Sequence, residues 1–112
     1  MLFLHLYKSV NKVTKFLMKS DYQNTIVSKI RKLRLSKNYS QQDISAILNI
    51  SNGQIGNIET PSKSHKYTLA QLAILCDEFN INITNLFLED IEGLSTDEVT
   101  KRLINSLIEY EK

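Results

Sequence analysis

Three amide side chains, Asn52, Gln54 and Asn57, lie within six residues of one another near the middle of the chain. An amide donates and accepts hydrogen bonds at once, which matches the N6 and N7 atoms of adenine in the major groove of DNA. A helix could present such side chains together on an exposed face. The same stretch contains an Asn-Gly pair between two isoleucines, however, and that pattern is typical of a tight β-hairpin. The neighbouring elements must decide between the two.

The surroundings of this Asn-Gly pair favour the helix. Only residues 48–51 precede it as a possible strand, and they follow directly on a helix-like run. No third strand is available, and an isolated two-stranded hairpin is marginally stable. In the helical alternative, Ser51 caps the first turn, Ile55 and Ile58 share a buried face, and Glu59 stands at the end. The sequence therefore predicts a helix here.

Composition indicates a single, mostly helical domain with appendages. The chain has 112 residues, of which 42% are hydrophobic, and only three glycines and one proline are available for the turns of an all-β fold. The one cysteine, Cys76, excludes an internal disulfide and a cysteine-based zinc site. It lies on an apolar helical stripe, which favours a core position over a reactive thiol. Such sparse cysteine use predicts a reduced, cytoplasmic setting. No apolar run reaches the roughly 18 residues of a transmembrane helix, so none is expected.

Charge is distributed unevenly along the chain. Residues 1–67 hold 11 Lys/Arg and 3 Asp/Glu, a net of +8, whereas residues 68–112 hold 3 and 9, a net of −6. A basic front half and an acidic back half suggest an anionic partner bound on one side. The alternative is a solvated surface of mixed charge with chance clustering.

The first residues predict an amphipathic helix. Apolar residues recur at helical spacing over residues 2–19, and four lysines fall on the opposite side: Lys8, Lys12, Lys15 and Lys19. Such a helix could pack on another chain or lie on a membrane surface. The residues before Met18 could equally be an accessory or mis-started segment. The sequence leaves these three interpretations open.

Later residues predict a succession of helices. Ser40 with Asp43 has the spacing of a capping box, as has Thr68 with Gln71, and Asn49 can turn the chain because asparagine tolerates positive φ. The expected helices cover residues 25–37, 40–48, 51–59, 68–79, 84–88 and 95–110. We therefore expect an N-terminal extension at 1–24, a central domain at 25–90 and a C-terminal helix at 91–112.

The last of these helices carries a wide apolar stripe. It consists of Val99, Leu103, Leu107 and Tyr110, with Ile104 and Ile108 alongside. This is more apolar surface than a lone terminal helix needs, so we expect the stripe to pack on another chain or on the N-terminal helix. We assign a dimerisation surface to four residues: Val99, Leu103, Leu107 and Tyr110.

A short helix, a sharp turn at Asn49 and a second short helix form a helix-turn-helix pattern, seen in QQDISAILNISNGQIGNIE. Residues 30–87 resemble the lambda-repressor-like, Cro-type (XRE-family) helix-turn-helix domain. The resemblance implies an all-α, five-helix DNA-binding domain, here with an extra N-terminal and an extra C-terminal helix. It also implies a transcriptional repressor that binds double-stranded DNA as a homodimer. Ser45 and Asn49 replace the alanine and glycine that the family often has, and both are small or turn-tolerant.

The resemblance also implies roles for individual residues. Base reading falls to Asn52, Gly53, Gln54 and Asn57, and Gln41 both binds a phosphate and braces the reading helix. Phosphate contacts are also expected from nearby cations and from Ser51 at the start of the helix. The full set of expected phosphate contacts is Arg31, Lys37, Gln41, Ser51, Lys63, His65 and Lys66. Arg34 and Glu59 match a salt bridge that ties the first helix of the domain to the third in some relatives; they could instead be two unrelated surface charges.

The proposed reading helix contains no lysine or arginine. Its amides favour steps that contain A·T pairs, and the missing arginines argue against strong guanine recognition. The weak charge also motivates an alternative, a protein-interaction module on the same fold that resembles an antitoxin or an anti-repressor adaptor. An enzyme is not expected, because no catalytic constellation, glycine-rich phosphate loop or metal cluster is evident. We expect no cofactor, metal, small-molecule ligand or membrane partner.

Overall fold

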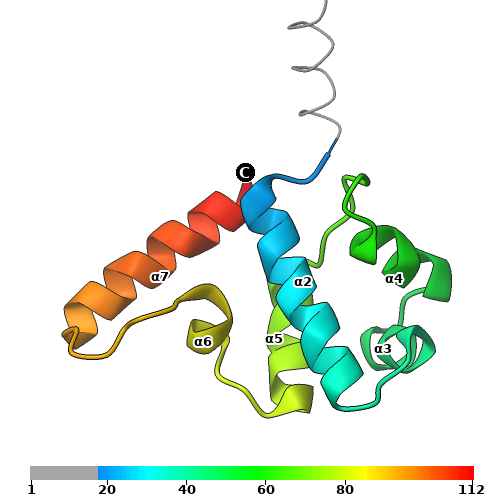
Figure 1. Cartoon of the computed structure of the whole chain (residues 1–112), viewed down its shortest axis with the longest axis horizontal. Helices are drawn as coiled ribbons and strands as arrows, with labels where there is room; N and C mark the ends of the chain where they lie inside the picture. The colour runs from blue at the N-terminus through cyan, green and yellow to red at the C-terminus, as the bar shows by residue number, and fades with distance from the viewer. Residues whose placement is uncertain (1–17) are drawn as a thin grey trace, which may run out of the picture.

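The computed structural model describes residues 18–112, and within that range it contains six helices and no strand (Figure 1). The helices are α2 (Asp21–Ser36), α3 (Gln41–Leu48), α4 (Asn52–Glu59), α5 (Leu69–Phe79), α6 (Ile83–Phe87) and α7 (Thr96–Glu111). The all-α prediction is confirmed. The predicted N-terminal helix lies outside the described residues, except for Met18 and Lys19, which are not helical.

Side-chain caps set where most of these helices begin. At α3, α4 and α5 the hydroxyl of Ser40, Ser51 or Thr68 accepts a hydrogen bond from the backbone N–H three residues later. The side chain of that later residue in turn accepts a hydrogen bond from the backbone N–H of the capping residue. Each cap satisfies N–H groups that have no partner inside the helix. Ser20 and Gln23 form a fourth capping box, so α2 begins at Asp21 and not at Thr25 as predicted.

Two asparagines in the left-handed conformation end helices. Asn49 closes α3 with φ 55° and ψ 46°, and Asn80 closes α5 with φ 56° and ψ 46°. Asparagine visits this region more readily than most residues that carry a Cβ. The sharp turn predicted at Asn49 is thus confirmed, and it joins α3 directly to α4.

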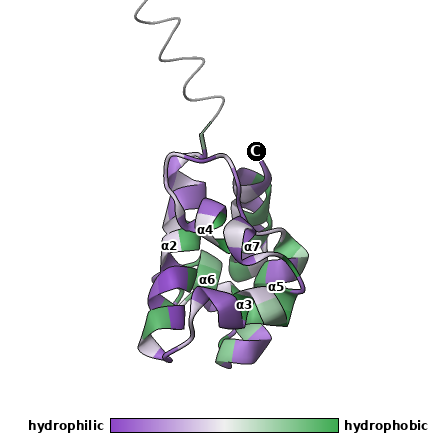
Figure 2. Cartoon of the chain, turned by 90° about the vertical axis from the view of Figure 1, so that its right-hand side faces the viewer, coloured by the Kyte–Doolittle hydropathy of each residue, from purple (hydrophilic) through white to green (hydrophobic). Residues whose placement is uncertain are grey.

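One apolar core lies between the helices, with α2 at its centre in contact with α4, α5, α6 and α7. In Figure 1, α3 and α4 lie on one side of α2, and α6 and α7 lie on the other. Figure 2 shows hydrophilic and hydrophobic residues on the same helices, as expected for amphipathic helices around a shared core. Cys76 is 2% exposed, and burial raises the pKa of its thiol, so its predicted core position is confirmed.

Tyr110 fastens α7 to this core and is fully buried. Its ring packs edge-to-face on Phe87 with centroids 5.6 Å apart, and its hydroxyl donates to the Tyr67 carbonyl oxygen over 2.6 Å. Leu103 and Leu107 also pack against the core. The assignment of Tyr110 to a dimer surface was therefore wrong, because the side chain is used inside the protomer.

The exposed apolar residues of α7 are the two that the sequence placed beside that stripe. Ile104 is 51% exposed and Ile108 is 54% exposed. They are four residues apart and hence neighbours on one face of the helix. Among the described helices, none combines the length and apolar character needed to cross a membrane.

Candidate nucleic-acid interface

Helices α3 and α4 pack closely across the Asn49 turn. The N–H of Ile50 donates to the Ser45 carbonyl oxygen over 3.1 Å, which holds the chain against the end of α3. Ser45 is 8% exposed, so a small side chain stands where the two helices approach. This arrangement fixes the direction in which α4 leaves the turn.

The first turn of α4 is open to solvent. Asn52, Gly53 and Gln54 are exposed, whereas Asn57, one turn later, is half-buried. The amide oxygen of Gln54 accepts a hydrogen bond from the Ser51 N–H over 3.0 Å as part of the cap. Of the three predicted amides, Asn52 is therefore the one fully free for a ligand, and Gln54 keeps only its NH₂ group for one.

Neither glycine of α4 is required by packing. A Cβ built on Gly53 would lie 4.0 Å from the Ser51 hydroxyl, and one on Gly56 would lie 4.0 Å from the Gln41 side-chain oxygen. Both distances are ordinary contacts, and both glycines have helical backbone without positive φ. Since glycine costs a helix roughly 1 kcal/mol relative to alanine, their presence has no explanation in the fold itself.

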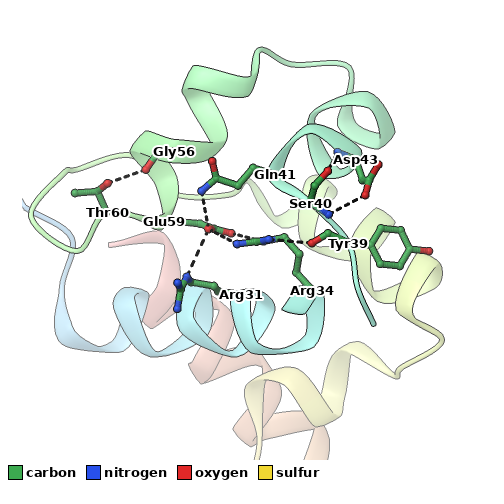
Figure 3. A network of polar contacts seen from close by, with 9 residues as sticks. All are labelled: Arg31, Arg34, Tyr39, Ser40, Gln41, Asp43, Gly56, Glu59 and Thr60. Carbon is green, nitrogen blue, oxygen red and sulfur yellow. Dashed lines mark hydrogen bonds and ion pairs between the residues drawn. The ribbon is translucent and has the colours of Figure 1, made fainter. Parts of the chain in front are cut away.

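The far end of α4 is held by a buried ion pair (Figure 3). Arg34 on α2 donates from Nε and Nη2 to the two carboxylate oxygens of Glu59, each over 2.8 Å, and its Nη1 donates to the Tyr39 carbonyl oxygen over 2.9 Å. The side chains are 7% and 5% exposed. Parallel N–H···O bonds of this kind fix both distance and orientation. The predicted pair is present, and the alternative of two unrelated surface charges is excluded.

Gln41 joins the same cluster from α3. Its Nε2 donates to Glu59 Oε1 over 3.0 Å (Figure 3), so the predicted bracing of α4 is observed. Arg31 approaches the same oxygen at 3.7 Å while its own side chain remains 54% exposed. Side chains of α2 and α3 thus meet at the carboxylate of Glu59 in α4. The orientation of α4 is therefore held by Arg34 and Gln41.

The remaining predicted phosphate contacts lie at several places on the surface. Lys37, Ser51, Lys63 and His65 are exposed, with Lys37 at the end of α2 and Ser51 at the start of α4. Lys63 and His65 belong to the loop between α4 and α5, which in Figure 1 rises beside α4. Cations at both places could hold the phosphate backbone while α4 faces the groove.

A family model described as helix-turn-helix matches residues 30–84, from within α2 to the second residue of α6. Residues 30–84 are thus a helix-turn-helix domain of the lambda-repressor-like type. The comparisons with curated proteins and with solved structures each give no match. Helix α7 lies beyond the part of the helix-turn-helix domain that the family model covers.

One of the predicted phosphate contacts of the helix-turn-helix domain faces α7 instead. The ammonium of Lys66 donates to the Tyr110 carbonyl oxygen over 2.8 Å and lies 5.0 Å from the centroid of the Tyr110 ring. A cation at the last turn of a helix is favoured by the helix dipole. Lys66 is therefore engaged in holding α7, unlike Lys63 and His65 of the same loop.

Lys19 contacts the helix-turn-helix domain, which no pattern in the sequence indicates. It was expected on the polar side of an N-terminal helix, but it is 5% exposed and reaches into the loop after α4. Its spacing in the sequence matched the other N-terminal lysines, so no local signal distinguished it. Within residues 18–112, no three side chains of the His, Cys, Asp and Glu types gather as a possible metal site.

Proposed function

We propose that this chain is a sequence-specific, double-stranded-DNA-binding regulator of transcription that acts in the cytoplasm as a repressor. The observation that supports this most directly is the exposed first turn of α4, carrying Asn52 and Gln54, on a helix whose other end is held by the Arg34–Glu59 pair. A fixed helix with free amides suits the major groove, where small errors of position forfeit hydrogen bonds.

Affinity and specificity come from different residues in this proposal. Phosphates are held by Lys37 and Lys63, with Arg31, His65, Gln41 and the start of α4 around Ser51 adding further contacts. Bases are read by Asn52, by the NH₂ group of Gln54 and by Asn57, which is half-buried. Because α4 carries no cation, adenine is the base that its side chains fit best.

The outer face of α7 supports a homodimer. Consider an antiparallel pair of α7 helices that cross at residue 106. Residues equally far before and after this position then face each other, so Ile104 lies opposite Ile108 of a second copy. The same arrangement places Lys101 opposite Glu111, and these two residues are exposed and have opposite charges. A second copy therefore covers the two exposed isoleucines and also places unlike charges together. Repression then follows from occupancy, because a dimer bound at a promoter excludes polymerase.

Selection of bound duplexes from random DNA tests the proposal. We expect enrichment of an inverted repeat whose half-sites contain A·T steps, because two copies related by a two-fold axis read two half-sites. The variant in which Asn52, Gln54 and Asn57 are all alanine should retain weak salt-sensitive binding but lose the enrichment. If the wild type enriches no sequence, the adaptor alternative on the same fold is favoured and DNA reading is wrong.

A further inference from the structure

Lys19 places a buried ammonium beneath the loop between α4 and α5. Its Nζ donates to the carbonyl oxygens of Thr60, Lys63 and His65 over 3.0, 2.7 and 2.6 Å. An ammonium has three donors, and all three are used. No carboxylate within residues 18–112 forms an ion pair with it. Backbone dipoles alone therefore balance this charge, and burial lowers the pKa of the ammonium.

The three carbonyl groups determine which way the loop backbone faces. All described peptide bonds are trans, so the C=O of one residue and the N–H of the next point in opposite directions. The carbonyls of Lys63 and His65 turn inward to Lys19, and the N–H groups of Ser64 and Lys66 consequently turn outward. Within the described residues, neither of these N–H groups donates to a backbone carbonyl.

The outward side of the loop is suited to an anion. Lys63, Ser64 and His65 are exposed, and Ser64 and Lys66 supply the two outward N–H groups. The loop is also fixed at both ends, because the Thr60 hydroxyl donates to the Gly56 carbonyl oxygen over 2.7 Å and Tyr67 is fully buried. Between those ends, the Lys63 N–H donates to the Thr60 carbonyl oxygen over 3.1 Å and the Asn24 amide donates to the Pro61 carbonyl oxygen over 3.5 Å. Lys19 alone holds the carbonyls of Lys63 and His65 inward among the described contacts.

We infer that Lys19 is a positioning residue for DNA binding, holding the loop of residues 60–66 in the conformation that presents Lys63 and the Ser64 and Lys66 amides to a backbone phosphate. This inference rests on the proposed function, since the phosphate is that of bound DNA. Lys19 itself touches no phosphate, because its three donors are occupied from below the loop.

The test compares Lys19→Met, Lys19→Arg and Lys63→Ala in binding a mixed-sequence DNA duplex at several salt concentrations. Loss of one phosphate contact makes the slope of log affinity against log salt shallower by about one. We expect that change and a several-fold weaker affinity in Lys19→Met and in Lys63→Ala. Lys19→Arg keeps donors for the carbonyls and should restore most of the binding. Arg102→Met removes an exposed charge from α7 and serves as the matched control, with an unchanged slope.

Combining the variants shows whether Lys19 affects DNA binding by positioning the loop or by its own charge. If Lys19 acts through the loop, Lys19→Met adds no further change of slope in the Lys63→Ala protein. Fully additive effects, or a folded Lys19→Met protein that keeps the wild-type slope, would overturn the inference and leave the proposed function standing. A wild type that binds no duplex overturns both.

A measurement on the wild type alone guards against a Lys19→Met protein that does not fold. Adding the duplex should shift the NMR amide signals of Ser64 and Lys66, because their N–H groups meet the phosphate. Shifts at α4 without shifts at these two amides would show that DNA binds elsewhere and that the loop takes no part.

Discussion

Arg34 and Glu59 form a bidentate buried ion pair that joins the last turn of α2 to the last residue of α4, with both N···O distances at 2.8 Å. A carboxylate at the C-terminal end of a helix is opposed by the helix dipole, and the guanidinium offsets that repulsion. The pair is buried at the last residue of α4, whereas the first turn of that helix is exposed. It therefore orients the helix without occupying the surface that would meet DNA.

Removal of one partner of this pair should destabilise the fold strongly. Glu59→Gln leaves Arg34 buried without its counter-charge, and broken buried pairs cost about 3–5 kcal/mol. Urea unfolding measures the loss. Glu89→Gln is the matched control, because Glu89 is 74% exposed and pairs with Lys29 over 3.1 Å, so its loss should cost less than about 1 kcal/mol. Replacing both Arg34 and Glu59 by methionine should recover much of the stability; similar costs for Glu59→Gln and Glu89→Gln would contradict this account.

Removing either of two buried tyrosine hydroxyls should change the stability of the fold in opposite directions. Within residues 18–112, the Tyr67 hydroxyl is buried without a hydrogen-bond partner, whereas the Tyr110 hydroxyl donates to the Tyr67 carbonyl oxygen over 2.6 Å. Burial raises the pKa of both, so both stay protonated at neutral pH. Tyr67→Phe should be neutral or more stable by about 1 kcal/mol, and Tyr110→Phe less stable by a similar amount. Thermal unfolding of the two variants decides, and a large loss in Tyr67→Phe would reveal a partner for that hydroxyl.

Much of this fold could be predicted because its signals are local. Ser40, Ser51 and Thr68 cap helices through residues three positions away, and Asn49 turns the chain by its own backbone preference. Ser20 and Gln23 carry the same signal, and α2 begins there, four residues before the predicted start. The Gln54 cap belongs to this group too, and it reduces the part of Gln54 that is free to read bases.

The other errors concern residues whose role depends on distant partners. Tyr110 and Lys66 are 44 positions apart, and Lys19 and Lys63 are also 44 apart, so no periodicity within a helix could relate them. A helix shows which of its faces is apolar, but the partner that covers the face is chosen by tertiary packing. This is why Tyr110 was assigned to a second copy. The Arg34–Glu59 pair, 25 positions apart, was found only because a family resemblance supplied the long-range relation.

The outer face of α7 predicts how the proposed dimer can be broken. Ile104→Lys places a charge at the centre of the antiparallel pair and should give a monomer by sedimentation equilibrium. The change should leave folding intact, since Ile104 is 51% exposed. Ile74→Lys is the matched control, because this isoleucine is 47% exposed on α5 and lies outside the proposed interface. A dimer that survives Ile104→Lys and Ile108→Lys together would assign the interface to another surface.

Gly53 predicts a conflict between stability and DNA binding. The residue lies in the exposed first turn of α4 with room for a Cβ, whose closest neighbour would be 4.0 Å away. Gly53→Ala should therefore raise the free energy of unfolding by up to about 1 kcal/mol. If the missing side chain lets the helix backbone approach the groove, the same change should weaken binding of the selected duplex about tenfold.

Gly56→Ala separates these two effects. Its Cβ would lie 4.0 Å from the Gln41 side-chain oxygen at a half-buried position, so it should stabilise α4 to a similar degree without lowering affinity. Urea unfolding and titration of the selected duplex give both quantities for each variant. A Gly53→Ala protein that is more stable and binds the duplex as tightly as the wild type would show that the glycine is merely tolerated. In that case base reading would depend on Asn52 and its neighbours without close approach of the backbone.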